Sequence, residues 1–175
     1  MAFANPAGNV EQLGLKEGMH VADLGAGTGA YTIPLAAAVG DSGRVYAVEV
    51  QKELLQNIKS AANAEHLRNI ELLWGDIERL GSTKIADHAV DYVIVANVLF
   101  QIEDREGFMA EVKRILRPGG KLLLVDWKDS YGGMGPQPEH VIAPDTARAL
   151  FERNGFSFEK EIQTGEQHYG FIVVK

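Results

Sequence analysis

The chain has 175 residues, of which 46% are hydrophobic and 23% are charged, values typical of one globular domain with its own core. Its formal net charge of -7 would repel a phosphate backbone, which argues against general nucleic-acid binding. The absence of cysteine excludes disulfides, thiolate metal sites and cysteine nucleophiles. We therefore expect a single domain over residues 1–175, with no metal site.

The amino-terminal segment, MAFANPAGNVEQLG, has neither a basic start nor an apolar core. No run approaches the roughly 18 consecutive apolar residues that span a bilayer. We expect a cytoplasmic protein without a membrane segment. One short helix is expected from Val10 to Leu15.

Short runs rich in valine, isoleucine and leucine then alternate with segments whose apolar residues recur at helical spacing. The expected strands are His20 to Leu24, Arg44 to Glu49, Ile70 to Trp74, Val90 to Ala96 and Lys121 to Asp126. The expected helices are Thr28 to Val39, Gln51 to Ala64, Arg105 to Leu116 and Asp145 to Asn154. Because most of these strands are apolar on both faces, the pattern predicts an α/β fold, a parallel sheet between two helical layers.

The last part of the chain changes pattern. Two strand-like runs, Ser157 to Gln163 and His168 to Val174, flank a four-residue connection that contains Gly165. This arrangement predicts an antiparallel hairpin, where an ordinary dinucleotide-binding domain would have another crossover helix.

A glycine-rich turn follows the first strand, in the run Asp23-Leu24-Gly25-Ala26-Gly27-Thr28-Gly29. Glycines allow the backbone to approach a ligand closely, and the amides of a helix start would point into the same crevice. Glu49 ends the second strand about twenty residues later, where a carboxylate can accept both hydroxyls of a ribose. Together the two features predict a nucleoside ligand.

Two nucleosides fit this pattern, because Gly25, Gly27 and Ala30 also satisfy the dinucleotide form G-x-G-x-x-A. A pyrophosphate favours a helix amino terminus, whereas the ammonium group of a sulfonium amino acid favours a carboxylate such as Asp23. After the third strand, Asp76 is suited to the adenine amine and Ile77 to the adenine ring. After the fourth strand, the Asn97 amide is expected to face the crevice.

At this point the sequence resembles the class I S-adenosylmethionine-dependent methyltransferases from about residue 13 onward. VADLGAGTG is similar to their first motif, AVEV to the second, and Gly75-Asp76 to the adenine-binding position. DYVIVANVLFQIED resembles their fourth-strand motif and LRPGGKLLLVDW their fifth strand. The resemblance implies a Rossmann-like three-layer sandwich whose sheet has seven strands, the seventh inserted antiparallel.

The same resemblance implies S-adenosylmethionine as cofactor and a small-molecule acceptor, as in the branch that includes quinone-biosynthesis and arsenite methyltransferases. Without cysteine, a thiol-dependent arsenite mechanism is excluded. The cofactor-binding residues that we expect are Asp23, Gly25, Ala26, Gly27, Thr28, Gly29, Glu49, Val50, Gly75, Asp76, Ile77 and Asn97.

No catalytic residue is assigned from the sequence. Methyl transfer from a sulfonium needs alignment and exclusion of water, and a base only where the acceptor must lose a proton. Asp126 and Asn97 are weak catalytic candidates, and Gln101 and Lys128 are further residues at the edge of the site. For Asp126 a helix cap or a solvated loop acid is the simpler interpretation.

The remaining histidines and the loop after the fifth strand leave alternatives open. His140 and His168 lack metal-like spacing, which favours a surface or hairpin position for both. The segment Ser130 to Pro138 is either a loop that closes over substrate or a plain connector. Trp127 and Tyr131 either line an acceptor pocket or simply pack. An open acceptor site is consistent with a large or flat substrate, or with a homodimer.

One basic cluster comprises Lys113, Arg114, Arg117 and Lys121. Because it falls at a predicted helix end, dipole complementation and solvation explain it better than a phosphate site does. The sequence thus favours a methyltransferase. The alternatives are a non-catalytic module that binds S-adenosylmethionine or S-adenosylhomocysteine and an NAD-dependent oxidoreductase.

Overall fold

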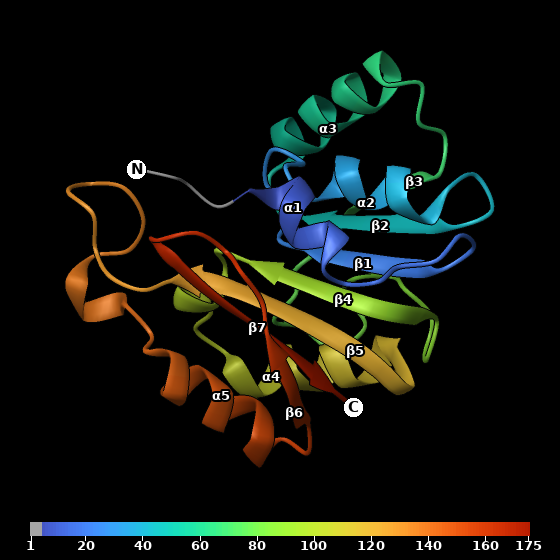
Figure 1. Cartoon of the computed structure of the whole chain (residues 1–175). Helices are drawn as coiled ribbons and strands as arrows, with labels where there is room; N and C mark the ends of the chain where they lie inside the picture. Colours follow the sequence, from blue (N-terminus) through green and yellow to red (C-terminus); the bar gives the residue numbers. More distant parts are fainter. Residues whose placement is uncertain (1–4) are drawn as a thin grey trace.

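The computed structural model describes residues 5–175, and its seven strands form one sheet in the order β3-β2-β1-β4-β5-β7-β6 (Figure 1). All neighbouring strands are parallel except β7, which is antiparallel to both β5 and β6. The strands are β1 (His20–Leu24), β2 (Arg44–Glu49), β3 (Ile70–Trp74), β4 (Val90–Ala96), β5 (Leu116–Trp127), β6 (Ser157–Glu161) and β7 (His168–Val174). The predicted fold class is confirmed. The prediction of one domain over residues 1–175 stays a prediction, and residues 1–4 lie outside the described part.

Helices cover both faces of this sheet (Figure 1). The α-helices are α1 (Pro6–Glu11), α2 (Thr32–Val39), α3 (Lys52–Ala64), α4 (Arg105–Ile115) and α5 (Pro144–Arg153), with 3-10 turns η1 (Leu99–Gln101) and η2 (Pro138–His140). Alternate residues of β4 face opposite ways: Tyr92 and Ile94 pack with α1 and α2, while Val93 and Val95 pack with α4 and α5. α3 lies on the same side as α2, against Ala47 of β2. This alternation produces the three layers.

Two helices in the amino-terminal half begin elsewhere than expected. The first spans Pro6–Glu11 in place of Val10 to Leu15, because Asn5 caps it through the Gly8 amide and Pro6 occupies its first turn. The second begins at Thr32 in place of Thr28. Its predicted first turn lies in the glycine loop, where positive φ angles at Gly27 and Gly29 are incompatible with a right-handed helix.

In the carboxyl-terminal half the largest difference concerns β5. α4 ends at Ile115, and Leu116 already has extended backbone and pairs with Val90 of β4. β5 therefore begins at Leu116, which was expected to end the helix, and not at the expected Lys121. β6 is shorter than expected because the backbone of Gln163 turns away to bond both ends of the Gln12 side-chain amide. α3 begins one residue later than expected. α5 begins and ends one residue earlier than expected.

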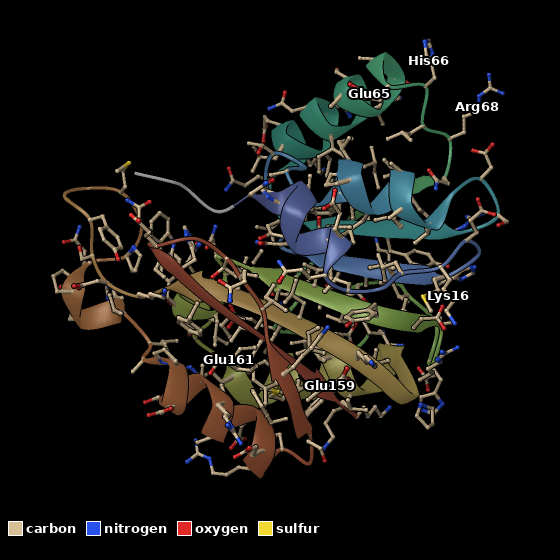
Figure 2. All side chains as sticks on the ribbon, in the orientation of Figure 1. Lys16, Glu65, His66, Arg68, Glu159 and Glu161 are labelled. Carbon is tan, nitrogen blue, oxygen red and sulfur yellow. The ribbon has the colours of Figure 1, made fainter. Side chains whose placement is uncertain are left out.

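The strand order brings the functional region to one edge of the sheet. β1 lies between β2 and β4, so the connections that follow β1 and β4 leave in opposite directions along the sheet. A crevice forms at such a switch point, outside the carboxyl ends of the strands. Elsewhere polar side chains such as Glu65, His66 and Arg68 project from the outer surface (Figure 2). Within residues 5–175 no helix has the length and apolar character that crossing a membrane requires.

Candidate functional site

A cavity of about 640 Å³ opens at the carboxyl edge of the sheet. Its walls come from the carboxyl ends of β1, β2, β4 and β5, from the segments that follow β1, β2, β3 and β4, from Pro6 of α1 and from the first residue of β7. Of the expected cofactor-binding residues it brings together Asp23, Gly25, Ala26, Gly27, Thr28, Glu49, Val50, Gly75, Asp76, Ile77 and Asn97. Gly29 does not line the cavity. It packs against α3, where an added Cβ would lie 3.0 Å from Ile58 Cγ1.

The loop after β1 brings bare backbone to the cavity. At Gly25 a Cβ atom would lie 2.6 Å from Val98 Cγ2, so only glycine allows this close packing between the β1 and β4 loops. Gly27 has a φ of +55°, and a Cβ there would have 4.0 Å of space to its nearest neighbour, the Gly25 carbonyl. The main chain at Gly27 is therefore accessible, and a ligand can approach it closely.

Glu49 closes the loop from the neighbouring strand. Its Oε2 accepts a hydrogen bond from the Gly27 amide at 2.9 Å. Its Oε1 accepts from the amides of Val50 and Gln51, at 2.8 and 3.0 Å. The end of β2 and the glycine loop are thus on the same rim of the sheet, as one bound sugar would require. Three backbone donors fix a carboxylate that is only 7% exposed.

Asp23 lies deeper, at 2% exposure, where its Oδ2 accepts from the Thr32 hydroxyl at 2.6 Å. Burial raises the pKa of Asp23 to about 6, the Thr32 hydrogen bond opposes the rise, and the nearby Glu49 charge adds to it. Tyr31 also lines the cavity and accepts from the Asn9 side chain at 2.7 Å. A buried acid with one side-chain donor retains capacity for a cation, such as an ammonium group.

The segment after β3 forms a tight corner. A Cβ at Gly75 would lie 2.5 Å from the Ser82 carbonyl, and the Asp76 amide donates to Ser82 Oγ at 3.0 Å. The Asp76 carboxylate accepts from the Glu78 amide at 2.9 Å, and its other oxygen pairs with Arg79 at 3.2 Å. Ile77 is buried beside them. The corner combines an acid with an apolar wall, the combination that an adenine ring needs.

Asn97 follows β4 with a φ of +59°, which is uncommon for a residue with a side chain. Its amide donates to the Val125 carbonyl at 2.8 Å and its carbonyl accepts from the Gln101 side chain at 3.1 Å. The side-chain Oδ1 is buried and has no hydrogen-bond partner among the described residues. Such strained backbone and an orphaned acceptor are features of ligand sites.

Asp126 and Lys128 do not line the cavity. The Asp126 side chain is 2% exposed and accepts from the Trp127 amide at 2.8 Å. Burial raises the pKa of Asp126 to about 6, although the amides of Trp127, Phe100 and Leu99 oppose the rise. The interpretation of Asp126 as a solvated acid is therefore wrong. Lys128 is exposed and its Nζ donates to the Gly165 carbonyl at 3.4 Å.

His168 is the functional candidate that the sequence does not reveal. It lies on the predicted hairpin, but it is 2% exposed, so a surface position is wrong. β5 and β7 pair it with Trp127, and the two ring centroids are 4.2 Å apart. Both residues line the cavity, and neither imidazole nitrogen has a hydrogen-bond partner within the described residues. Burial lowers the pKa of His168, and the charge of Lys128 lowers it further.

The loop after β5 packs over Trp127. A Cβ at Gly135 would lie 2.6 Å from the Trp127 indole, and the Tyr131 ring centroid lies 6.1 Å from it. Backbone hydrogen bonds between Tyr131 and Met134 close a tight turn within this loop. Tyr131 does not line the cavity, whereas Trp127 does. His140 is exposed on η2, as a surface position predicts.

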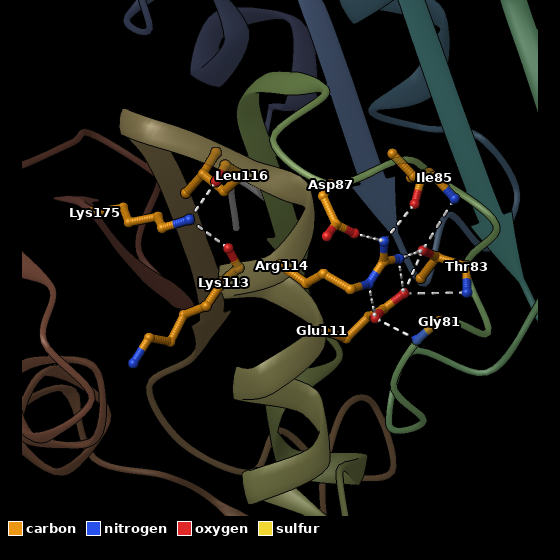
Figure 3. Close-up of polar contacts among 9 residues, drawn as sticks. All are labelled: Gly81, Thr83, Ile85, Asp87, Glu111, Lys113, Arg114, Leu116 and Lys175. Carbon is orange, nitrogen blue, oxygen red and sulfur yellow. Dashed lines mark hydrogen bonds and ion pairs between the residues drawn. The ribbon is translucent and has the colours of Figure 1, made fainter.

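The basic cluster belongs to the scaffold. Arg114 bonds Glu111 twice at 2.8 Å and Asp87 at 2.7 Å (Figure 3). Arg117 pairs with Asp91, and Lys121 with Glu159. These pairs occupy three of the four basic side chains of the cluster. Those of Arg114 fasten α4 to the connection between β3 and β4, and those of Arg117 and Lys121 join β5 to β4 and to β6.

Comparison with known proteins places this geometry in a family. Residues 15–165 match the family described as "Methyltransferase domain". A demethylmenaquinone methyltransferase from Geobacillus sp. (strain WCH70) is 29% identical over 117 residues, which are 67% of this chain and 49% of the relative. The chain spans about half the length of the curated relatives it matches.

Solved structures give the same result. A SAM-dependent methyltransferase from Aquifex aeolicus is 29% identical, with a TM-score of 0.88, over 98% of this chain and 90% of its own. An arsenic(III) S-adenosylmethionine methyltransferase from Chlamydomonas reinhardtii is 22% identical, with a TM-score of 0.70, over 99% and 65% of the two chains. At that lower identity the likeness concerns the fold alone.

Proposed function

Since this chain belongs to the class I S-adenosylmethionine-dependent methyltransferases, a family of enzymes whose cofactor is S-adenosylmethionine, we propose that it methylates a small molecule at the edge of the cavity. The observation that carries this proposal is the 2.9 Å contact between the Gly27 amide and Glu49 Oε2. That contact puts the carboxylate proposed for the ribose beside the loop proposed for the rest of the cofactor.

The cavity wall fits the cofactor group by group. We assign the ammonium group to Asp23, the ribose hydroxyls to Glu49 and the adenine amine to Asp76, with Val50 and Ile77 against the ring. The open space at Gly27 and the unpaired Oδ1 of Asn97 support this assignment. The wall also contains Gly25, Ala26, Thr28 and Gly75, and Gly29 packs against Ile58 of α3 outside it.

When bound, S-adenosylmethionine supplies an electrophilic methyl group on a sulfonium. The residues of this chain then act mainly by holding the donor in one orientation and keeping water away from the reacting atoms. Asn97, directly after β4, is a proposed contact near the acceptor. Asp126 stays a weak candidate for a base, because it is buried behind the wall.

The acceptor itself is proposed only as a small molecule. Relatives are demethylmenaquinone methyltransferases, and a quinone-like acceptor is the version of the proposal that they favour. The net charge of -7 argues against a nucleic-acid acceptor. A cytoplasmic location and a homodimer stay predictions.

Isothermal titration with S-adenosylmethionine, S-adenosylhomocysteine and NAD tests the proposal. We expect the first two to bind and NAD to give no heat. Binding of NAD alone would indicate the oxidoreductase instead.

A second experiment separates an enzyme from a binding module. The protein is incubated with methyl-labelled donor and a cell extract that has been split into small molecules, protein and RNA. Label in the small-molecule fraction is the expected result. Binding of the donor with no labelled product in any fraction would favour the module.

A further inference from the structure

Trp74 is an exposed tryptophan that directly precedes Gly75, a residue of the cavity wall. It ends β3, it is 52% exposed, and it does not itself line the cavity. In the sheet it pairs with Glu49, the residue assigned to the ribose. Because a half-exposed ring gains only part of the stabilisation that full burial gives, the role of this side chain depends on the contacts of its indole.

The indole fixes the main chain of Val50. Its Nε1 donates to the Val50 carbonyl at 2.9 Å, and the Val50 amide donates to Glu49 Oε1 at 2.8 Å. Val50 lies between β2 and α3 and belongs to neither element. Its amide and its carbonyl are therefore held by two side chains, those of Glu49 and Trp74, in place of regular secondary structure.

Val50 is one of the two residues assigned to the adenine ring. It lines the cavity and is 55% exposed. An apolar side chain that is exposed in the free protein becomes buried when a flat base covers it, which favours binding. The full gain requires that the main chain already holds the side chain in place, because a loose segment must be ordered when the ligand binds.

Two lysines restrain the indole in turn. Lys52 Nζ lies 4.1 Å from the centroid of the Trp74 ring, and Lys84 Nζ lies 6.0 Å from it. Within residues 5–175 neither lysine forms an ion pair. An ammonium group at this distance from an indole is attracted to the ring. Since Lys52 begins α3 and Lys84 belongs to the connection after β3, two segments hold the ring that bonds Val50.

We propose that Trp74 is a positioning residue for the adenine end of the cofactor, which holds Val50 where it packs on the base. Lys52 contributes by holding the indole. The inference rests on the proposed function, because it uses the assignment of Val50 to adenine. Trp74 then contributes to the affinity for the nucleoside and makes no contribution to binding of the amino-acid end.

Two ligands separate the ends of the cofactor site. Calorimetry is performed with S-adenosylhomocysteine and with 5′-methylthioadenosine, which has the same nucleoside but no amino acid. Trp74→Phe keeps a ring beside Lys52 and removes the indole donor. We expect both ligands to bind about three- to tenfold more weakly, the net contribution of one hydrogen bond. Asp23→Asn provides the contrast, since it should weaken S-adenosylhomocysteine and leave 5′-methylthioadenosine at parental affinity.

The role of Lys52 is tested by its coupling to Trp74. Lys52→Met keeps the aliphatic part of the side chain and removes the charge, and it should weaken both ligands by up to about fivefold. In a Trp74→Ala background, which lacks the ring, the same substitution should have no further effect. Such non-additivity is expected of two residues that act through one contact.

Nuclear magnetic resonance gives a spectroscopic test of the Trp74 indole. The chain has two tryptophans, so its spectrum contains two indole N–H signals, and Trp74→Phe identifies the one from Trp74. We expect this signal to shift when 5′-methylthioadenosine saturates the protein, because the carbonyl that it bonds belongs to the residue assigned to the base. A signal that does not move would contradict the proposal.

Phe158→Leu is the matched control. Phe158 lies on β6, at the other edge of the sheet, and the Arg148 guanidinium lies 3.9 Å from the centroid of its ring. This variant also loses a contact between a cation and an aromatic ring, but it should bind both ligands with parental affinity. Urea denaturation of each variant shows whether a loss of affinity is accompanied by a loss of stability.

The outcomes separate the two proposals. If S-adenosylhomocysteine does not bind to the unaltered chain, the proposed function fails. If it binds, but Trp74→Phe retains parental affinity or weakens only S-adenosylhomocysteine, the positioning role alone fails. Loss of stability in Trp74→Phe with unchanged affinity for both ligands would assign Trp74 to the scaffold. If Trp74→Ala does not fold, Trp74→Phe and the indole signal decide.

Discussion

Two buried carboxylates in this protein have opposite electrostatic surroundings. Asp23, in the cavity wall, is 2% exposed, and Glu111, on α4, is fully buried. Burial alone raises the pKa of both groups. For Glu111 the hydrogen bonds from Arg114, Thr83 and the Gly81 amide overcome burial and lower its pKa to about 2 (Figure 3). Asp23 has one side-chain donor, and its pKa rises to about 6.

The two acids differ in how many hydrogen bonds each accepts within the protein. Glu111 is complete without a ligand, so its charge stabilises the connection that it holds. The ionised form of Asp23 is costly in the free protein, and a bound cation would supply the partner that it lacks. Of these two acids, the one with fewer internal donors is the one that lines the cavity.

The largest effect is expected from breaking the ion pair between Arg114 and Glu111. Arg114→Met leaves Glu111 buried with only Thr83 and Gly81 as donors, and removal of one partner of a buried ion pair costs about 3–5 kcal/mol. Urea denaturation at pH 7 should show a loss of this size in the free energy of unfolding. Arg148→Met is the control, because the exposed pair with Glu152 is expected to contribute under about 0.5 kcal/mol. A loss below about 1 kcal/mol for Arg114→Met would contradict the scaffold role.

At Asp23 a substitution is expected to raise the free energy of unfolding, the opposite of the effect at Arg114. A folded pKa of about 6 against a reference of 3.8 means that the folded state binds the extra proton, so stability falls as pH rises from 3.8 to 6. Asp23→Asn removes that cost and should raise the free energy of unfolding at pH 7.5 by up to about 3 kcal/mol without ligand. Its S-adenosylmethionine binding should be lost. The exposed Asp41→Asn variant should stay within about 0.5 kcal/mol of the parent, and destabilisation by Asp23→Asn would refute the comparison.

A smaller effect is expected at Glu49, because three backbone amides already bond its carboxylate in the free protein. Glu49→Ala should weaken S-adenosylmethionine by about 1 to 3 kcal/mol, the contribution of charged hydrogen bonds to the sugar. Calorimetry measures the change. Glu53→Ala, in the exposed first turn of α3, should bind with parental affinity. Unchanged affinity in Glu49→Ala would remove this residue from the site.

The smallest expected effect is a dependence on pH. Since the pKa of Asp23 is about 6, its charge is lost below that pH and the affinity for S-adenosylmethionine should fall roughly tenfold for each further pH unit. Glu111, with a pKa of about 2, should stay ionised over the same range. Its stabilisation is present above pH 4.5 and declines between pH 4.5 and 2. Titration between pH 5 and 8 measures the first trend, and a flat affinity profile would show that Asp23 does not meet the ammonium group.

The sequence was sufficient for features that depend on neighbours along the chain. The strand-turn-strand frame with Gly27 and Glu49 was predictable, because parallel neighbours end on one edge of a sheet. The start of α2 was not, since three glycines with positive φ compete with a helical pattern. His168 escaped prediction because its burial depends on the pairing of β7 with β5, a register that no local pattern encodes. The burial of Glu111 likewise gave no signal, since two of its donors, Thr83 and the Gly81 amide, come from the distant β3–β4 connection.

The position of β7 has a consequence for biosynthesis. It follows the other six described strands along the chain, yet it lies between β5 and β6, so a ribosome releases those six strands before this sheet can close. Until then the flanks of β5 and β6 carry unpaired main-chain groups, a hazard for aggregation. His168 arrives with that same strand. A chain that lacked β7 would therefore retain the segments proposed for the donor but lose the part of the cavity wall that His168 forms.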